Sequence, residues 1–452
     1  MSERKKKYHI KTWGCQMNVY DSQRIGEILQ GLNYETCEDS TEADLVILNT
    51  CHVREKATEK VYSDIGRLKI LKDRRQSIGQ SLIIAVSGCV AQAEGEQIIK
   101  RAPCVDLVFG PQTWHRLEEM IKKVESDNAK VCDTDFPVEE KFDSLPTTFF
   151  DKSRINAGSA FVAIQEGCDK FCTYCVVPYT RGAEYSRPTW QVLEEINKLV
   201  KEGAKEITLL GQNVNAYHGL SHDNSEWTLG KLVEKISNIE GLDRIRYVTS
   251  YPAEVDEDLI NAHRDVPKLM PFLHLPIQSG SNKILKEMNR NHSVEEYLKL
   301  IDKLNFVRDD LAFSSDFIVG FPGETEEDFE ATLDVIRKVG FIQSFSFAYS
   351  PRLGTPAANR EDQIPEDVKE RRLQTLQSLL KETQAEFNEK TVGKTLDVLL
   401  DRKGKKEGQL AGKSPYMQSV VVNNASDDML GNVYKVKITS VYSISLIGEI
   451  VE

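Results

Sequence analysis

Three cysteines crowd one short stretch of the chain, "EGCDKFCTYCVVPYTRG", where Cys168, Cys172 and Cys175 are spaced C-x3-C-x2-C. Thiolates close together in one loop can bind three irons of a 4Fe–4S cubane, which leaves the fourth iron open to a small molecule. A structural zinc ion would need a fourth protein ligand to complete its tetrahedron, and no nearby His or Cys supplies one. We therefore predict an Fe–S cluster with one open iron at this loop.

Three further cysteines each stand where an apolar, strand-like run ends. Cys15 ends "YHIKTWGC", Cys51 ends "DLVILNTC" and Cys89 ends "SLIIAVSGC". A helix-like segment follows each run, which predicts a parallel sheet with ligands gathered at the carboxyl ends of its strands. Helix N-termini at that edge favour the thiolate form of cysteine. We expect these three thiolates to converge on a cationic group, although any one of them alone could be a small buried apolar side chain.

The composition is that of an ordinary globular chain. Its 452 residues suggest about three domains on a prior of roughly 150 residues each. The sequence shows no secretion signal, so we expect its nine cysteines to stand in a reducing compartment, and an odd number leaves at least one unpaired. Metal binding or catalysis is therefore a better explanation for the clustered cysteines than a disulfide framework. No apolar run approaches the ~20 residues of a membrane helix, so we expect a cytoplasmic protein without a membrane partner. The net charge of −12 argues against a chain that is basic throughout.

The pattern of strand-like and helix-like segments predicts an α/β chain in three parts. Residues 1–125 should form the parallel sheet that carries the first three cysteines, and the aperiodic residues 126–153 a linker. Residues 154–384 alternate six strand-like runs with helices, which indicates a partial (β/α)6 barrel with the C-x3-C-x2-C loop after its first strand. Residues 385–452 contain short β-rich runs between Gly, Asn and Asp, which is typical of a small all-β barrel.

The last part also carries a cluster of basic residues: Arg402, Lys403, Lys405 and Lys406. A small β-barrel with a basic loop commonly binds nucleic acid. An ordinary solvated turn explains the loop equally well. We predict that these four side chains help to hold a nucleic acid, because a polyanion must meet local positive patches on a chain that is acidic overall.

Seven motifs together resemble the radical S-adenosylmethionine (SAM) methylthiotransferases. They are "TWGCQMN", "LNTCHVREKA", "SGCVAQ", "GCDKFCTYCVVPYTRG", "LLGQNVNAY", "LHLPIQSGSNKIL" and "DFIVGFPGET". Within that family the match is to the type that makes 2-methylthio-N6-isopentenyladenosine in tRNA. The resemblance covers essentially the whole chain and implies an N-terminal methylthiotransferase domain, a radical SAM core and a C-terminal TRAM barrel.

The resemblance also implies two 4Fe–4S clusters and SAM as cofactors, with all six cysteines in catalytic and metal-binding positions. One cluster, on Cys168, Cys172 and Cys175, would chelate SAM through its open iron. The other, auxiliary cluster would sit on the same three N-terminal cysteines that the strand-end argument selects. In the family, one SAM methylates a sulfur on the auxiliary cluster and a second SAM yields a 5′-deoxyadenosyl radical. The radical removes hydrogen from carbon 2 of the adenine, where the methylated sulfur is inserted.

Further ligand positions follow from the resemblance alone. The family packs an aromatic residue near the SAM adenine and holds the methionine amino group after the second barrel strand. The positions in this chain that we expect to contact SAM are Tyr174, Gly211, Gln212, Asn213, Gln278 and Ser279. Turn formation or packing is the alternative for each of them. Expected partners are the anticodon stem-loop of tRNA and a reductant such as flavodoxin or ferredoxin, with the chain as a monomer.

Other functions stay open on the sequence. Relatives perform the same chemistry on threonylcarbamoyl-adenosine in tRNA or on an aspartate of a ribosomal protein. A protein of another class, a non-catalytic two-cluster redox protein, would also explain six ligating cysteines. It would not explain a SAM-type barrel.

Overall fold

The computed structural model describes residues 4–51, 57–127, 129–137, 141–142 and 154–451. None of the helices in these ranges is long and apolar enough to cross a membrane.

The chain folds into two compact units. The first joins Met1–Arg154 to Val176–Ala183, and the second joins Ile155–Cys175 to Glu184–Glu452. The short segment that follows Cys175 therefore packs with the first unit, although the residues on both sides of it belong to the second.

The first unit is built on a parallel sheet with the strand order β2-β1-β3-β4-β5-β6. Its strands are β1 (Lys6–Thr12), β2 (Tyr34–Thr36), β3 (Leu45–Thr50), β4 (Ile83–Gly88), β5 (Leu107–Phe109) and β6 (Val131–Asp133). Strand β6 lies within the predicted linker of residues 126–153, of which 128, 138–140 and 143–153 are outside the described residues.

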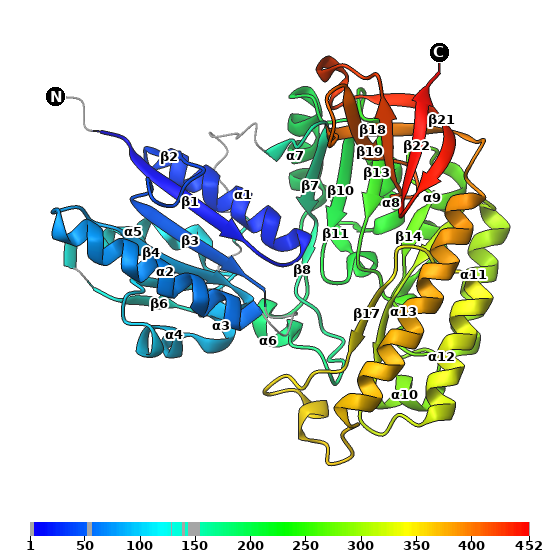
Figure 1. Cartoon of the computed structure of the whole chain (residues 1–452), viewed down its shortest axis with the longest axis horizontal. Helices are drawn as coiled ribbons and strands as arrows, with labels where there is room; N and C mark the ends of the chain where they lie inside the picture. The colour runs from blue at the N-terminus through cyan, green and yellow to red at the C-terminus, as the bar shows by residue number, and fades with distance from the viewer. Residues whose placement is uncertain (1–3, 52–56, 128, 138–140, 143–153, 452) are drawn as a thin grey trace. The chain divides into compact units, whose positions relative to one another are not determined.

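Helices cover both faces of this sheet (Figure 1). They are α1 (Gln16–Gly31), α2 (Ala57–Ser77), α3 (Cys89–Glu94), α4 (Glu96–Arg101) and α5 (Leu117–Asp127). Alternate residues of β3 face opposite ways: Leu45 and Ile47 pack with α1 and α5, whereas Val46 and Leu48 pack with α2. Burial on both sides explains why β3 and β4 read as unbroken buried runs.

The core of the second unit is an arc of parallel strands. They are β7 (Ser159–Ala163), β10 (Glu206–Leu210), β13 (Arg244–Tyr247), β14 (Phe272–His274), β15 (Ala312–Ser314), β16 (Asp316–Val319) and β17 (Phe345–Ala348). Parallel pairing joins β7 to β10, β10 to β13, β14 to β15 and β16 to β17. Bridges Ile245–Leu269 and Gln278–Phe317 complete the arc. Because β15 and β16 are halves of one strand interrupted at Ser315, the arc is a six-stranded partial barrel, as predicted.

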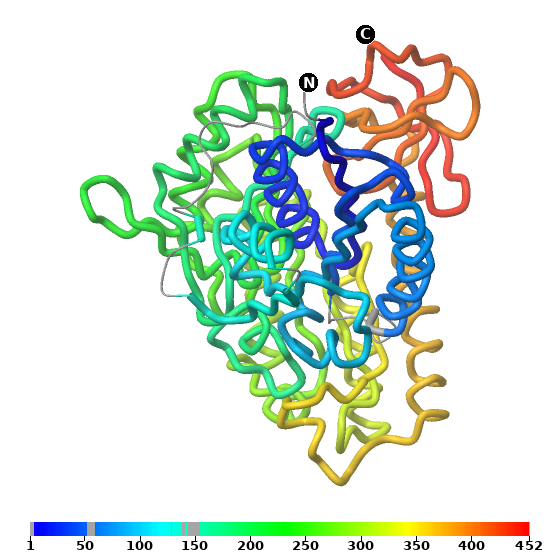
Figure 2. Tube along the Cα trace, turned by 90° about the vertical axis from the view of Figure 1, so that its left-hand side faces the viewer, coloured from blue at the N-terminus to red at the C-terminus, as the bar shows by residue number. Residues whose placement is uncertain are grey.

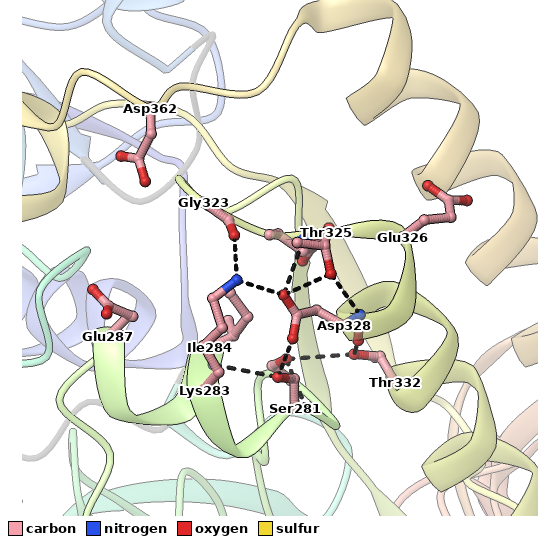
Figure 3. A network of polar contacts seen from close by, with 12 residues as sticks. Ser281, Lys283, Ile284, Glu287, Gly323, Thr325, Glu326, Asp328, Thr332 and Asp362 are labelled. Carbon is pink, nitrogen blue, oxygen red and sulfur yellow. Dashed lines mark hydrogen bonds and ion pairs between the residues drawn. The ribbon is translucent and has the colours of Figure 1, made fainter.

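The helices of this barrel are α7 (Thr189–Lys201), α8 (Leu229–Ser237), α9 (Glu257–Asp265), α10 (Asn282–Glu287), α11 (Val294–Val307), α12 (Glu326–Val339) and α13 (Glu366–Glu389). Five of these seven helices begin at a side-chain cap, whereas α7 and α13 each follow a proline. Thr325 and Asp328 form a reciprocal capping box at the start of α12. The same carboxylate accepts from Ser281 Oγ at 2.6 Å and from Lys283 Nζ at 2.9 Å, and Lys283 also donates to the Gly323 carbonyl (Figure 3). One aspartate thus fixes α12, α10 and the intervening loop.

The chain ends in a closed five-stranded barrel with the strand order β18-β19-β20-β22-β21. The strands are β18 (Thr395–Lys403), β19 (Gln409–Lys413), β20 (Ser419–Asn423), β21 (Val433–Tyr442) and β22 (Ser445–Ile450), drawn in orange and red in Figure 2. Alternate apolar residues such as Val398, Val420 and Val436 fill its interior. Helix α13 runs through the predicted boundary at residue 385 and ends at Glu389.

This C-terminal barrel docks against the amino ends of the central strands. Arg246 donates to the carbonyls of Ser414 (2.9 Å) and Pro415 (2.8 Å). Arg244 donates to the Lys413 carbonyl at 3.1 Å and to that of Asp397. Because Arg244 begins β13, the docking surface lies at the opposite end of the strands from the loops that follow their carboxyl ends.

Candidate active site

The structure places the three N-terminal cysteines at the ends of three adjacent parallel strands. Cys15 caps α1 after β1, Cys51 directly follows β3, and Cys89 begins α3 after β4. The backbones approach closely there, since a Cβ on Gly14 would lie 2.4 Å from the Cβ of Cys51. Gly14 has φ +129°, so a side chain at this position would be strained as well.

The electrostatics of this edge favour an anionic sulfur. A hydrogen bond with Cys51 and the charge of Arg181 lower the pKa of Cys15 to about 6. Burial raises the pKa of Cys89, and the charge of Arg181 opposes that rise. Arg181 lies on α6 (Val177–Arg181) and pairs with the buried Asp21 at 2.7 Å. A fixed guanidinium beside thiols stabilises their thiolate forms, which are the forms that bind metal.

These thiols do not form a compact site for a single metal ion. Among the described residues, no three His, Cys, Asp or Glu side chains are gathered tightly enough to hold one metal ion. A cubane separates its cysteine sulfurs more widely than one tetrahedral zinc does. The donor set at this edge is three thiols at strand ends, which could supply three ligands to such a cluster.

The second cysteine triplet lies in a loop that two distant segments pin in place. The loop leaves β8 (Gln165–Glu166), and the N–H of Cys175 donates to the Cys172 carbonyl at 2.9 Å. Between them, the N–H of Thr173 donates to the Met288 carbonyl at 3.1 Å, and its own carbonyl accepts from the N–H of Ala357 at 3.0 Å. The backbone of the loop is therefore anchored by the fold around it.

A buried arginine contacts one sulfur of this triplet. Arg290 Nη1 lies 3.7 Å from Cys172 Sγ, and its Nη2 donates to the Pro276 carbonyl at 2.6 Å. The guanidinium also stacks over the Tyr251 ring at 4.2 Å from its centroid. An N–H directed at a ligating sulfur raises the reduction potential of an iron–sulfur cluster, because it stabilises the added electron.

The loop after β10 is tied to the cysteine loop through amide side chains. Gln165 Oε1 accepts from the backbone N–H groups of Gln212 (2.8 Å) and Asn213 (3.0 Å). Gln212 Oε1 accepts in turn from the Gly167 N–H at 2.7 Å. Gly211 stands against Gln165 Oε1, which leaves only 2.4 Å for a Cβ there. Gly211 and Gln212 therefore have structural partners that account for their residue types.

Asn213 has an unused acceptor that suits a ligand ammonium. Its Nδ2 donates to Glu254 at 2.5 Å, and Glu254 also pairs with Lys170 of the cysteine loop. Its buried Oδ1 has no hydrogen-bond partner among the described residues. Because a buried amide oxygen without a partner costs free energy, a bound N–H donor would satisfy it. This observation makes the barrel mouth compatible with the methionine end of SAM.

The three remaining predicted SAM contacts differ in how far their side chains are already engaged within the fold. Tyr174 packs beside the apolar cluster that contains Met288, and burial raises its pKa well above the ordinary value, with nearby Cys172 adding to the rise. Gln278 has φ +78° and ends the extension of β14, with its backbone paired to β16. The Ser279 hydroxyl is used within the fold, since it accepts from the Ser281 N–H at 3.2 Å.

The predicted RNA-binding residues lie together at the end of β18 and in the loop after it, all exposed. Arg402 pairs with Asp401 at 2.5 Å and Lys403 pairs with Asp427 at 2.5 Å. Lys405 and Lys406 have no carboxylate partner among the described residues. Those two lysines therefore offer the readily available positive charge of the loop.

Sequence reasoning did not find Arg290, Gln165 or the Lys170–Glu254 pair. Their motifs carry no spacing signal, because each acts on a partner far away in the chain. A lone Arg in "EMNRNHS" gives no hint that it reaches a cysteine 118 positions earlier.

Three family models match the chain in succession. They are "Uncharacterized protein family UPF0004" over residues 7–110, "Radical SAM superfamily" over residues 162–336 and "TRAM domain" over residues 389–451. A protein of Rickettsia canadensis (strain McKiel), named tRNA-2-methylthio-N(6)-dimethylallyladenosine synthase, is 55% identical over 446 residues. The alignment covers 98% of this chain and 99% of that protein. The chain belongs to the radical SAM methylthiotransferase family. Membership makes it a radical SAM enzyme, and the superfamily implies a 4Fe–4S cluster and SAM as its cofactors.

Solved structures agree in fold at much lower identity. The radical S-adenosylmethionine methyltransferase TsrM from Kitasatospora setae aligns with a TM-score of 0.57 at 13% identity, over 78% of this chain and 77% of its own. The cobalamin-dependent S-adenosylmethionine radical enzyme OxsB aligns with a TM-score of 0.54 at 12% identity, over 84% of this chain and 56% of its own. At these identities the likeness concerns the fold alone.

Proposed function

We propose that this family member is a tRNA methylthiotransferase, which inserts a methylthio group at carbon 2 of N6-isopentenyladenosine next to the anticodon. The supporting observation is 55% identity, over nearly the full length, to a protein named for that reaction product. The dimethylallyl group in its name is the isopentenyl group. The reaction consumes two molecules of SAM and takes its sulfur from an auxiliary cluster.

The barrel mouth would hold the cluster that activates SAM. Cys168, Cys172 and Cys175 supply three thiolates, and such a cluster with SAM bound supplies a carbon-centred radical able to break an aromatic C–H bond. Asn213 Oδ1 would accept a hydrogen bond from the ammonium of SAM, and Tyr174 would border its adenine. Gly211, Gln212, Gln278 and Ser279 are proposed as backbone or side-chain contacts of the same ligand.

The first unit would hold the auxiliary cluster on Cys15, Cys51 and Cys89. Their strand-end positions and the nearby charge of Arg181 support this assignment. We further propose domain limits of 1–125, 126–153, 154–384 and 385–452, a monomer, and a flavodoxin- or ferredoxin-like reductant.

The RNA would be held in part by the C-terminal barrel. Its basic loop carries Arg402, Lys403, Lys405 and Lys406, of which the two loop lysines are the best available for phosphate. The target adenosine must leave its stack, because carbon 2 is inaccessible in a stacked loop.

Anaerobic reconstitution with iron and sulfide tests the two-cluster assignment. We expect roughly eight irons per chain in the wild type and roughly four in a Cys15→Ala, Cys51→Ala, Cys89→Ala variant. A matched control replaces Cys37, Cys104 and Cys132, which should leave the iron content unchanged. An N-terminal triple variant that retains the full iron content would contradict the auxiliary site.

Mass spectrometry of the RNA product tests the reaction. With a reductant, SAM and an isopentenylated anticodon stem-loop, the wild type should form the 2-methylthio base. The N-terminal triple variant should still cleave SAM without transferring sulfur. Product only with a threonylcarbamoylated stem-loop or with a ribosomal protein would assign the alternative substrates, and absence of SAM cleavage would favour a non-catalytic redox protein.

A further inference from the structure

The open edge of the partial barrel carries two exposed phenylalanines. Among the described residues, strand β17 pairs on one side only, with β16, and Phe345 and Phe347 on it are 57% and 42% exposed. Large apolar side chains at a strand edge are costly to expose to water, so an apolar group bound against these two rings would lower the free energy.

Strand register shows that both rings face the interior of the barrel. Phe345 stands opposite Asp316 and Phe347 opposite Ile318, and laterally paired residues of parallel strands share a face. The alternate residue of β16, Phe317, is fully buried and meets Phe341 edge to face at 5.4 Å, on the side that the helices cover. Asp316, Ile318 and both exposed rings therefore line the opposite, inner side.

The inner wall is polar at the amino ends of the strands and apolar toward their carboxyl ends. At its amino end, His274 lies 3.5 Å from Asp316 and 3.0 Å from Ser314 Oγ, and its ring meets Phe345 edge to face at 6.2 Å. Toward the carboxyl end the wall is apolar: Ile318 and Tyr174 both pack against the cluster that contains Met288. Phe347 adjoins Ile318 and is therefore the ring on the side of the cysteine loop.

We propose that Phe347 and Ile318, with Phe345 below them, bind the branched five-carbon group on N6 of the substrate adenosine. This inference rests on the proposed function and names the contact that would make it selective. The adenine itself is polar at its edges, whereas its N6 substituent is purely hydrocarbon. An apolar wall at the barrel mouth distinguishes an isopentenylated base from an unmodified one. Apolar surface of the wall is buried, with a gain in free energy, only when the hydrocarbon tail is present.

The position of the wall agrees with the geometry that the reaction requires. The cysteine loop and Tyr174 lie at the carboxyl ends of the strands, and Phe347 is two residues closer to that end than Phe345. A base that projects its tail onto Phe347 keeps its ring near the mouth. The His274–Asp316 pair then closes the wall below with a polar surface, which limits how far a hydrocarbon tail reaches.

Binding of two RNAs that differ only in the isopentenyl group tests this inference. The reconstituted protein is titrated with labelled anticodon stem-loops, one carrying isopentenyladenosine and one carrying adenosine. Wild type should prefer the isopentenylated RNA, and Phe347→Ala should reduce that preference by about tenfold, as expected for hydrocarbon recognised in an apolar pocket. Phe347→Leu should retain part of the preference, since it remains apolar.

A matched control is Phe306→Ala on α11, where the ring is 91% exposed and no wall is formed. It should leave both affinities unchanged. Iron content and SAM binding equal to wild type establish that each variant is folded. An unchanged preference in Phe347→Ala overturns the inference, and so does an equal loss for both RNAs, which would indicate base stacking instead.

The proposed function is tested separately by the wild type. If wild type cleaves SAM but neither prefers nor modifies the isopentenylated RNA, the proposed function fails. If wild type modifies that RNA but Phe347→Ala keeps the full preference, as the control Phe306→Ala does, the proposed function stands and only the tail-binding wall is wrong.

Discussion

Replacing Glu206 with Gln removes a buried charge from the contact between the two barrels of the second unit. Glu206 Oε2 accepts from Arg246 Nε at 2.8 Å and lies 3.5 Å from Arg244 Nη1, and all three side chains are buried. The two guanidinium groups also donate to four carbonyls of the C-terminal barrel. Glutamine keeps the shape of the side chain but leaves two buried cations without their counter-charge.

The expected cost is about 3 kcal/mol. Removing one partner of a buried ion pair costs about 3–5 kcal/mol, and the lower end applies because the carbonyls still accept from both arginines. A loss of this size lowers an equilibrium constant roughly 150-fold. The melting temperature of this unit should fall by roughly 5 °C.

Calorimetry of the full chain measures the loss, and timed proteolysis shows whether the segment between α13 and β18 becomes accessible. Glu234→Gln, exposed on α8, is the matched control and should change stability by less than about 0.5 kcal/mol. A Glu206→Gln protein that melts with wild type and resists cleavage equally would refute the reasoning.

Acid sensitivity gives an independent check on the same residue. Burial alone would raise the pKa of Glu206, but the charges of Arg246 and Arg244 outweigh it and hold this pKa below its usual value. The stabilisation is therefore complete above the unfolded pKa of about 4.3 and is lost as the pH falls through the lower, folded pKa. Glu206→Gln should lack this part of the acid dependence.

Three further changes address the cluster, the RNA loop and the fold. Arg290→Met should shift the midpoint potential of the barrel-mouth cluster to more negative values in an EPR-monitored titration, because the N–H directed at Cys172 is lost; an unchanged potential would argue against that contact. Changing Lys405 and Lys406 to Glu should weaken stem-loop binding and reduce its salt slope by about 2 while SAM cleavage persists. Asp328→Ala should destabilise the fold by about 2–4 kcal/mol in thermal melts, since four donor groups on Ser281, Lys283 and Thr325 lose their acceptor. Asp334→Ala, at an exposed position of α12, is the matched control and should leave the thermal stability nearly unchanged.

Local pattern was enough to predict the features that depend on neighbours in the chain. Strand-like runs that are each followed by a helix-like segment predicted the parallel sheet, and the six strand-like runs of residues 154–384 predicted the barrel. The family resemblance supplied its function. Strand β6 was missed because its three half-buried residues show no run or alternation.

Contacts between residues far apart in the sequence could not be predicted from local patterns. Nothing near Arg290 indicates its sulfur partner, and nothing near Lys403 shows that Asp427 neutralises it. Both depend on how strands far apart in sequence are brought together. The wall formed by Phe345 and Phe347 was likewise hidden, because "SFSFAYSP" reads as an ordinary alternating strand until its unpaired edge is known.

The C-terminal barrel, to which we assign part of the RNA binding, lies away from the proposed site of bond breaking. It is fastened beneath the central strands, whereas bond breaking would occur above them, with at least the ~17 Å rise of a five-residue strand in between. An RNA fragment shorter than this separation cannot reach both levels at once. Trimming the RNA should therefore first weaken capture, and only later affect turnover of molecules that are already bound.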